Sequence, residues 1–232
     1  MINSDCIEFD QTKGIAILTD GLEQSEAGKI SAKLAAKSVF EGLRSDTFTN
    51  DLPSSNEEQV LNAIDKLLSK TNQVLIDASK AVGEENYMRT TIVAILIRKR
   101  KIFLGHVGDS RVYLLRNNIL ERLTRDHSLV QDLVFRGVYH QRKQKSSSID
   151  SVTRVLGAKP NIEITTLAHE IKSGDRLLLC SDGLPDMLSD KEIEEIANTE
   201  IHNLKKTTKN LIKFANRRGG RDNISVILAQ IP

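Results

Sequence analysis

Cysteine is almost absent from this chain of 232 residues, which contains only Cys6 and Cys180. The two lie far apart within apolar stretches, so we expect reduced, buried thiols, and we expect the protein to be cytoplasmic. A zinc site built from cysteine thiolates needs more of them, which excludes that class of metal centre. A metal ion in this protein would have to be held by oxygen ligands.

Aromatic residues and charge of one sign are also scarce. There is no tryptophan, aromatic residues make up 4% of the chain, and the formal net charge is +2. Few rings are therefore present on which bases could stack, and no broad basic field exists, so we expect no nucleic-acid partner. No apolar run reaches the length of a membrane span and no signal-peptide core precedes the first element, so we expect no membrane partner.

Hydrophobic periodicity predicts an α+β chain in which paired helices are separated by a run of short strands. Apolar residues recur at helical spacing over 25–43, where Ser25 is an expected N-cap, and over 56–81. Closely spaced strands follow within 90–124, and a short helix is expected at 127–136. This order does not fit βαβ units and favours a four-layer αββα sandwich, with two antiparallel sheets packed face to face and helices on both outer sides. The other expected elements are strands at 5–9, 14–20, 152–158, 162–171, 175–182 and 223–231, and helices at 190–198 and 202–217.

The segment 137–151, GVYHQRKQKSSSIDS, is polar and basic and predicts an exposed loop. No internal repeat is evident, and no linker divides the chain. We therefore expect a single domain over residues 1–232.

Aspartates stand where several of the predicted strands begin or end. The apolar runs in GIAILTDG, KIFLGHVGD and DRLLLCSDG end at Asp20, Asp109 and Asp182, and two further strands begin just after Asp5 and Asp222. In an antiparallel sheet the end of one strand lies beside the start of its neighbour, so these carboxylates can share one edge. Clustered anions repel one another unless cations lie between them. The pattern predicts a site for hard divalent ions, Mg²⁺ or Mn²⁺, bound through oxygen.

With these motifs the chain resembles the metal-dependent type 2C protein serine/threonine phosphatases, the PPM family, of the bacterial type. Each piece alone is common, but together they follow the family's order over nearly the whole chain. The resemblance implies the αββα sandwich and the hydrolysis of phosphoserine and phosphothreonine in proteins, with a phosphorylated target of a serine/threonine kinase as partner. The matching pieces are Asn3-x-Asp5, Asp20-Gly21, Thr90-Thr91, GHVGDSRVYLLR, LTRDHSLVQDLV, TRVLGA, SDGLPDML and GGRDNISVIL.

The resemblance implies that the clustered carboxylates hold two Mg²⁺ or Mn²⁺ ions. Asp20 would bridge the two ions, and the carbonyl of Gly21 would bind one of them. Asp182 and Asp222 would complete the shell of the first ion, and Asp5 would support the second through water. A water between the ions would then lose its proton and attack the phosphorus atom in line, which makes Asp20, Asp182 and Asp222 the carboxylates that activate it.

Three further acidic or amide positions match the family. Asp109, together with Asp182, corresponds to a position for a third ion in bacterial members. Asp186 corresponds to an acidic residue outside the metal shell, and Asn223 completes the family's Asp-Asn pair.

Three departures from the family pattern are the observations that support an alternative function. The family usually has an arginine that grips the phosphate three residues before the asparagine of Asn-x-Asp, and counting back from Asn3 leaves no such residue. Leu22-Glu23-Gln24 stands where a glycine pair is usual, and Arg89 stands where a glycine usually precedes Thr90. The alternative is a weak or inactive phosphatase-fold module that binds and regulates a phosphoprotein or kinase partner. Because every expected metal-binding carboxylate is present, an active enzyme is favoured.

Another arginine could replace the missing one, because a planar, bidentate donor suits a phosphate dianion. Arg89 precedes a strand whose start is expected at the metal-bearing edge. By resemblance 137–151 forms a flap over the active site, so Arg136 and Arg142 could reach the phosphate from above. The remaining alternative is that Arg89 points into solvent and phosphate is bound weakly.

Other polar residues are expected to have structural roles. A strand rather than a helix follows Ser110 in GDSR, which argues against Ser110 as a nucleophile. His106 is expected to pack within a strand, and His127 to cap the helix that follows Asp126. Thr90-Thr91 is expected to begin a strand rather than to supply a catalytic hydroxyl.

Overall fold

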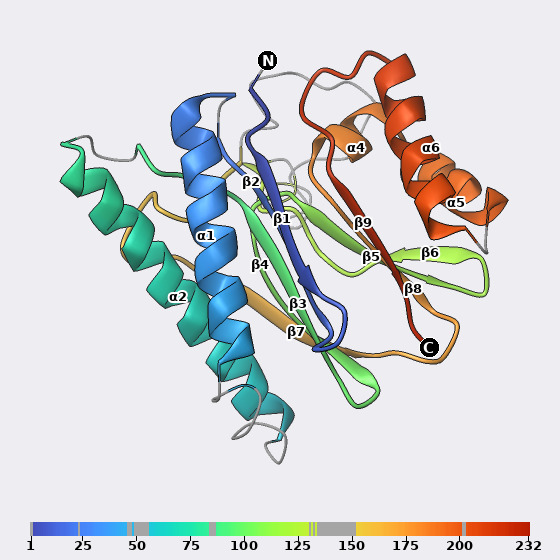
Figure 1. The fold of residues 1–232 in the computed structure, drawn as a ribbon, viewed down its shortest axis with the longest axis horizontal. Helices are drawn as coiled ribbons and strands as arrows, with labels where there is room; N and C mark the ends of the chain where they lie inside the picture. Colours follow the sequence, from blue (N-terminus) through green and yellow to red (C-terminus); the bar gives the residue numbers. More distant parts are fainter. Residues whose placement is uncertain are drawn as a thin grey trace.

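The computed structural model describes residues 2–22, 24–45, 48, 56–83, 87–129, 131, 133, 152–200 and 203–232. Within these residues the strands form two sheets, and every strand pair is antiparallel (Figure 1). The first sheet has the order β1-β2-β3-β4-β7: β1 (Asp5–Asp10), β2 (Ile15–Asp20), β3 (Ile92–Arg98), β4 (Lys101–Val107) and β7 (Thr165–Glu170). The second has the order β6-β5-β8-β9: β6 (Ile119–Arg122), β5 (Arg111–Arg116), β8 (Arg176–Cys180) and β9 (Val226–Gln230).

Helices cover the outer face of each sheet, as Figure 1 shows. The first sheet is covered by α1 (Glu26–Arg44) and α2 (Glu57–Ala81). The second is covered by α4 (Gly183–Met187), α5 (Asp190–Thr199) and α6 (Leu204–Arg217). The predicted αββα sandwich is therefore confirmed.

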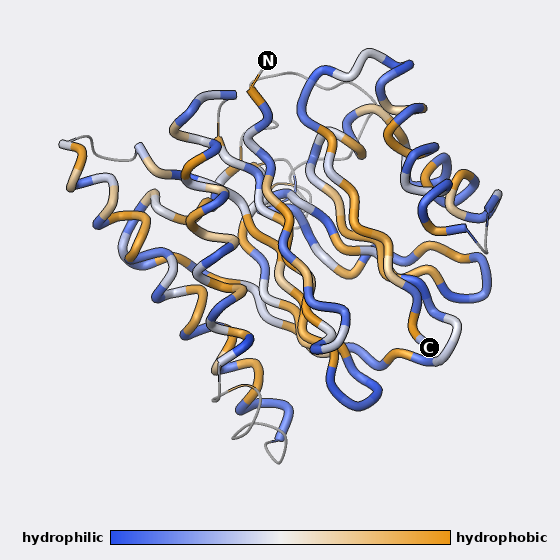
Figure 2. Tube along the Cα trace, viewed as in Figure 1, coloured by the Kyte–Doolittle hydropathy of each residue, from blue (hydrophilic) through white to orange (hydrophobic). Residues whose placement is uncertain are grey.

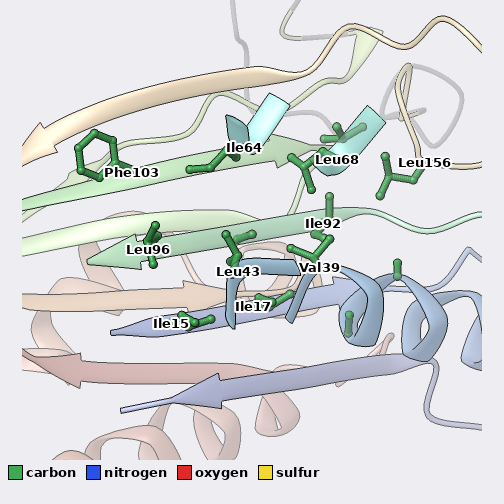
Figure 3. Packing of buried hydrophobic residues seen from close by; sticks show 14 of the residues in the cluster. Ile15, Ile17, Val39, Leu43, Ile64, Leu68, Ile92, Leu96, Phe103 and Leu156 are labelled. Carbon is green, nitrogen blue, oxygen red and sulfur yellow. The ribbon is translucent and has the colours of Figure 1, made fainter. Parts of the chain in front are cut away.

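The core lies in three apolar layers, one between each pair of neighbouring structural layers. In Figure 3, Val39, Leu43 and Leu68 on the helices face Ile17 and Ile92 on the first sheet. The layer between the two sheets and the layer beneath α4–α6 are formed by two further clusters. Figure 2 shows the consequence, with hydrophobic residues along the central strands and hydrophilic ones at their ends.

Strand alternation explains why these runs are continuously apolar. Successive side chains of a strand point to opposite faces, and both faces of these sheets are buried. In β8, Leu177 and Leu179 enter the layer between the sheets, whereas Leu178 and Cys180 pack beneath the outer helices. Most positions of such a strand are therefore apolar, and the carboxylates stand at its ends.

The helix starts follow the sequence signals. Ser25 caps α1, because its side chain accepts a hydrogen bond from the backbone N–H of Gly28, as predicted. Asn56 and Gln59 form a reciprocal capping box at the start of α2.

One expected strand is absent from the described residues, and one helix was not expected. The segment 152–158 makes only isolated bridges, at Val152 and Leu156, instead of a strand. Gly157 has a φ of +86°, and a Cβ there would lie 1.9 Å from the carbonyl oxygen of Met88, so the chain turns where a strand would continue. The short helix α4 was not predicted, because five residues are too few to show helical periodicity.

Some expectations fall where the structure gives no description. The helix at 127–136 is only partly within the described residues. The loop 137–151 lies outside them, as do Arg136 and Arg142.

Cys180 is buried and Cys6 is half-buried, and both are free thiols. Among the helices of the described part of the chain, none has the length and apolarity that a bilayer crossing requires.

Candidate metal centre

Two of the predicted ligands are direct neighbours in the first sheet. The register of β1 and β2 pairs Asp5 with Asp20. The next residue, Gly21, forms a bridge with Thr90 just before β3 begins. Asp5, Asp20, Gly21 and Thr90 therefore lie together at one end of this sheet, as the strand-end pattern predicted.

The second sheet brings further carboxylates to the same end of the sandwich. Cys180, the last residue of β8, is paired with Arg111 of β5 on one side and with Val226 of β9 on the other. Because both pairs are antiparallel, Asp109 and Asp182 continue side by side beyond Arg111 and Cys180. Asp222 precedes β9 beside the end of β8, where the N–H of Ser181 donates to the carbonyl of Ser225. Hereafter the edge aspartates are Asp5, Asp20, Asp109, Asp182 and Asp222.

Hydrogen bonds connect the two sheets at this edge. The backbone N–H of Ser4 donates to Asn223 Oδ1 at 2.9 Å, and the N–H of Gly21 donates to the carbonyl of Ser4 at 3.1 Å. Ser181 Oγ, which follows β8, donates to Asp5 Oδ2 at 2.9 Å. The ends of β2 and β8 and the segment before β9 are therefore joined to β1, which fixes the carboxylates relative to one another.

Glycine follows Asp20 and Asp182 because other backbone approaches closely there. A Cβ on Gly21 would lie 2.0 Å from the carbonyl oxygen of Gly28, at the start of α1. A Cβ on Gly183 would lie 2.1 Å from the carbonyl oxygen of Asn223. Side chains at these positions would push α1 and the Asn223 segment away from the edge.

Buried hydroxyls hold the backbone of Asp20. Thr90 Oγ1 donates to the carbonyl of Asp20 at 2.8 Å, and Thr91 Oγ1 accepts from the N–H of Asp20 at 3.2 Å. Thr91 Oγ1 also shares a hydrogen bond with Ser110 Oγ at 2.8 Å. Ser110 is fully buried, which agrees with its expected structural role.

Burial makes the cluster unfavourable when all its members are ionised. Burial raises the pKa of Asp182 to about 8, and the charge of Asp109 beside it adds to the rise. Burial likewise raises the pKa of Asp109 to about 6. The pKa of Asp20 lies well above its usual value, first through burial and then through the charges of Asp182 and Asp5. In the absence of cations the cluster therefore retains protons that a divalent ion would displace.

The donor set fits Mg²⁺ or Mn²⁺. Asp5 Oδ1 and Asp182 Oδ1 are buried, and neither has a hydrogen-bond partner within the described residues. Buried acceptors of this kind need a partner, and a cation or one of its waters would supply it. As the described residues are placed, no three acidic, histidine or cysteine side chains converge on one point. Mg²⁺ suits such a site, because it commonly keeps several waters beside its carboxylate ligands.

Two histidines hold the turn that carries Asp109. His106 Nε2 bonds to the carbonyl of Gly108 at 2.9 Å, and His127 Nδ1 accepts from the N–H of Gly108 at 3.2 Å. Burial lowers the pKa of His106 to about 4 and that of His127 to about 3, so both rings are neutral near pH 7. Their rings lie 4.3 Å apart between centroids.

The predictions for the two histidines have different outcomes. His106 packs within β4, as expected. The capping role expected of His127 is wrong, because Ser128 Oγ accepts the backbone N–H of Gln131. From the sequence alone, His127 and Ser128 were both possible caps. His127 instead accepts the N–H of Gly108, a contact between distant segments that the sequence does not reveal.

Two polar contacts were not foreseen from the sequence. Arg111 donates from Nε and Nη2 to Asp126, at 2.9 and 2.7 Å, which joins β5 to the segment after β6. Gln24 Nε2 donates to Asp222 Oδ1 at 2.8 Å. Arg111 and Asp126 are 15 positions apart, and Gln24 and Asp222 are 198 positions apart. No local sequence pattern reveals contacts over such separations.

The backbone of Arg89 lies at the edge that carries the aspartates, as expected. Its carbonyl accepts the backbone N–H of Leu22 at 3.1 Å, one position beyond the bridge between Gly21 and Thr90. The side chain is half-buried.

Comparisons with known proteins give one consistent result. The family model described as protein phosphatase 2C matches residues 1–229. The serine/threonine phosphatase stp of Listeria monocytogenes is 31% identical over 229 residues, which cover 98% of this chain and 88% of that protein.

Solved structures agree with the family match. The serine/threonine phosphatase of S. agalactiae has a TM-score of 0.87 at 29% identity, covering 99% of this chain and 93% of that one. The catalytic domain of the serine/threonine protein phosphatase PstP, solved in complex with two manganese ions, has a TM-score of 0.82 at 29% identity, covering 99% and 92%.

Asp182→Asn is expected to stabilise the metal-free protein, and more so at high pH. The pKa of Asp182 is about 8 in the folded state against 3.8 for a free carboxyl, so the folded state keeps a proton that the unfolded chain releases. The stability of the metal-free wild type should therefore fall as the pH rises from 3.8 towards 8, whereas a neutral asparagine removes this contribution.

Thermal unfolding in EDTA at about pH 5 and about pH 8 measures the difference, within the range where carboxyl titration alters stability. The Tm of the variant should exceed that of the wild type by more at the higher pH. Asp77→Asn, on the exposed face of α2, serves as the control and should show no such pH dependence. A variant that is less stable by the same amount at both pH values would contradict the prediction.

Proposed function

The chain belongs to the protein phosphatase 2C family, and we propose that the edge aspartates are the centre of a metal-dependent hydrolysis of phosphoserine and phosphothreonine in proteins. One observation carries the assignment of the site. Carboxylates from both sheets meet at one edge, and the buried oxygens Asp5 Oδ1 and Asp182 Oδ1 have no hydrogen-bond partner in the described part of the chain. An arrangement this unfavourable for the metal-free protein is understandable if the carboxylates bind ions.

We assign Mg²⁺ or Mn²⁺ as the cofactor. Asp20 and the carbonyl of Gly21 would bind at the end of β2, and Asp182 and Asp222 would complete the shell of one ion. Asp5 would act on the second ion through water. This division suits ions that keep part of their hydration shell.

A third ion is a further proposal, with Asp109 and Asp182 as its ligands. These carboxylates continue side by side from the register of β5 and β8, and the charge of Asp109 adds to the rise that burial causes in the pKa of Asp182. The neutral rings of His106 and His127 hold the turn at Gly108 without adding positive charge beside the site.

The side chains of this protein orient the reacting groups rather than attack the phosphate. When bound, the divalent ions supply Lewis acidity that lowers the pKa of a water and neutralises charge on the phosphoryl group. Thr90 and Thr91 fix the backbone of Asp20, and Ser181 fixes Asp5 through its hydroxyl. Ser110 is buried against Thr91, so its hydroxyl is not available to a phosphoprotein. We propose that water is the nucleophile.

The physiological setting is proposed in broad terms. The substrate is a phosphorylated protein, and we propose that it is the target of a serine/threonine kinase. The free thiols of Cys6 and Cys180 support a cytoplasmic location. The family match over residues 1–229 supports one domain spanning residues 1–232.

Hydrolysis of p-nitrophenyl phosphate and of a phosphothreonine peptide, each with Mn²⁺, with Mg²⁺ and with EDTA, tests the function. We expect turnover with the metals and none with EDTA, because the proposed hydrolysis needs a water activated by the divalent ions. Asp182→Asn should remove most of the turnover while the protein stays folded. Metal binding without turnover on either substrate would instead support the alternative, a phosphatase-fold module that binds and regulates a phosphoprotein or kinase partner.

A second test concerns the phosphate-binding residue, for which we propose Arg89. The carbonyl of Arg89 accepts the N–H of Leu22, next to the bridge between Gly21 and Thr90. The side chain of Arg89 is therefore attached at the edge that carries the aspartates. Arg89→Ala should lower kcat/KM by about tenfold or more, which corresponds to roughly 1.4 kcal/mol of lost transition-state stabilisation.

Steady-state kinetics of three arginine variants separates the possibilities. Arg100→Ala removes the same charge beyond the other end of β3 and should leave kcat/KM unchanged. Arg142→Ala tests the flap alternative. If Arg89→Ala matches the wild type, Arg89 does not hold the phosphate.

A further inference from the structure

Gln24 makes a contact that crosses the metal-bearing edge from one sheet to the other. It lies between β2 and α1, and its Nε2 donates to Asp222 Oδ1 at 2.8 Å. Asp222 precedes β9 in the second sheet and is separated from Gln24 by 198 positions. The contact thus connects the segment after Asp20 with a carboxylate that the proposed function assigns as a metal ligand.

The same oxygen of Asp222 has a second donor. The backbone N–H of Asn223 donates to Asp222 Oδ1 at 2.7 Å. Asn223 is itself held, because its Oδ1 accepts the N–H of Ser4 at 2.9 Å. Two donors on Oδ1 leave Oδ2 as the oxygen of Asp222 that can accept a cation.

The carboxylate of Asp222 lies close to the other edge aspartates. Its negative charge contributes to the raised pKa of both Asp5 and Asp182, after burial and other neighbours. Asp222 is nevertheless exposed, unlike Asp5 and Asp182, which are half-buried. An exposed aspartate loses rotamer freedom when it binds an ion unless other groups already hold it. Asp222 therefore depends on such groups more than the other ligands do.

We propose that Gln24 is a positioning residue for the metal centre, which holds the carboxylate of Asp222 so that its second oxygen is directed to the ion. The inference rests on the proposed function, since it takes Asp222 as a ligand. Groups that orient a ligand in this way commonly change metal affinity by about 10- to 100-fold when they are removed.

A glutamine suits this role for an electrostatic reason. Its amide donates a hydrogen bond without carrying a charge, whereas a lysine or arginine would pair with Asp222 and repel the cation. The side chain also spans the gap between the two sheets, which the glycine usual at this position by resemblance could not do.

The decisive variant is Gln24→Met, which keeps the length of the side chain and removes its N–H donors. Titration of the metal-free protein with Mn²⁺ by calorimetry should show about tenfold weaker binding of the ion that Asp222 holds. The Tm of the metal-free protein should change by no more than about 4 °C, since one partly exposed hydrogen bond contributes little to folding.

Gln73→Met provides a matched control. Gln73 Nε2 donates to Asp77 Oδ1 at 2.8 Å on the exposed face of α2, so the same amide–carboxylate bond is lost away from the edge. This variant should bind Mn²⁺ as the wild type does.

A double-mutant cycle with Asp222→Ala separates positioning from a general structural effect. If Gln24 acts through Asp222, Gln24→Met should weaken Mn²⁺ binding no further once Asp222 is alanine. Additive losses, or Mn²⁺ binding by Gln24→Met that equals or exceeds the wild type, would overturn the inference. If Asp222→Ala itself leaves Mn²⁺ binding unchanged, the assignment of Asp222 in the proposed function fails instead.

Discussion

Repulsion among buried carboxylates is the constraint on which this site depends. The two sheets bring the edge aspartates together where burial raises the pKa of Asp182 to about 8 and that of Asp109 to about 6. Such a cluster lowers the stability of the metal-free protein, because each buried charge needs a partner. The cluster becomes favourable when divalent ions lie between the carboxylates, so metal binding and the integrity of this edge are coupled.

The rest of the structure keeps those carboxylates in place. Strands with both faces buried leave polar groups only at their ends, and the antiparallel registers then put several ends at one edge. Close backbone approach at Gly21 and Gly183 brings α1 and the segment before β9 against the site. Hydroxyls and neutral histidines complete the frame without adding charge that would compete with the ions.

Departures from the family pattern concern residues around the edge aspartates, which we propose as metal ligands, and not the aspartates themselves. Arg89 and Gln24 occupy positions where glycine is usual by resemblance, and both lie at the metal-bearing edge. Gln24 donates to the carboxylate of Asp222, which a glycine could not do, and we propose that Arg89 binds the phosphate. The edge aspartates are thus all present, and the differences lie in the polar side chains beside them.

The sequence by itself determined the sandwich and the set of carboxylates, because periodicity reports which faces are buried and an aspartate at the end of an apolar run reports where the strand stops. Local pattern could not determine contacts between residues far apart in the chain. Only the tertiary structure showed that Gln24 holds Asp222, that His127 holds Gly108 instead of capping a helix, and that 152–158 turns at Gly157. Each of these depends on which segments lie side by side, and that is decided by the packing of the two sheets and not by the residues' immediate neighbours.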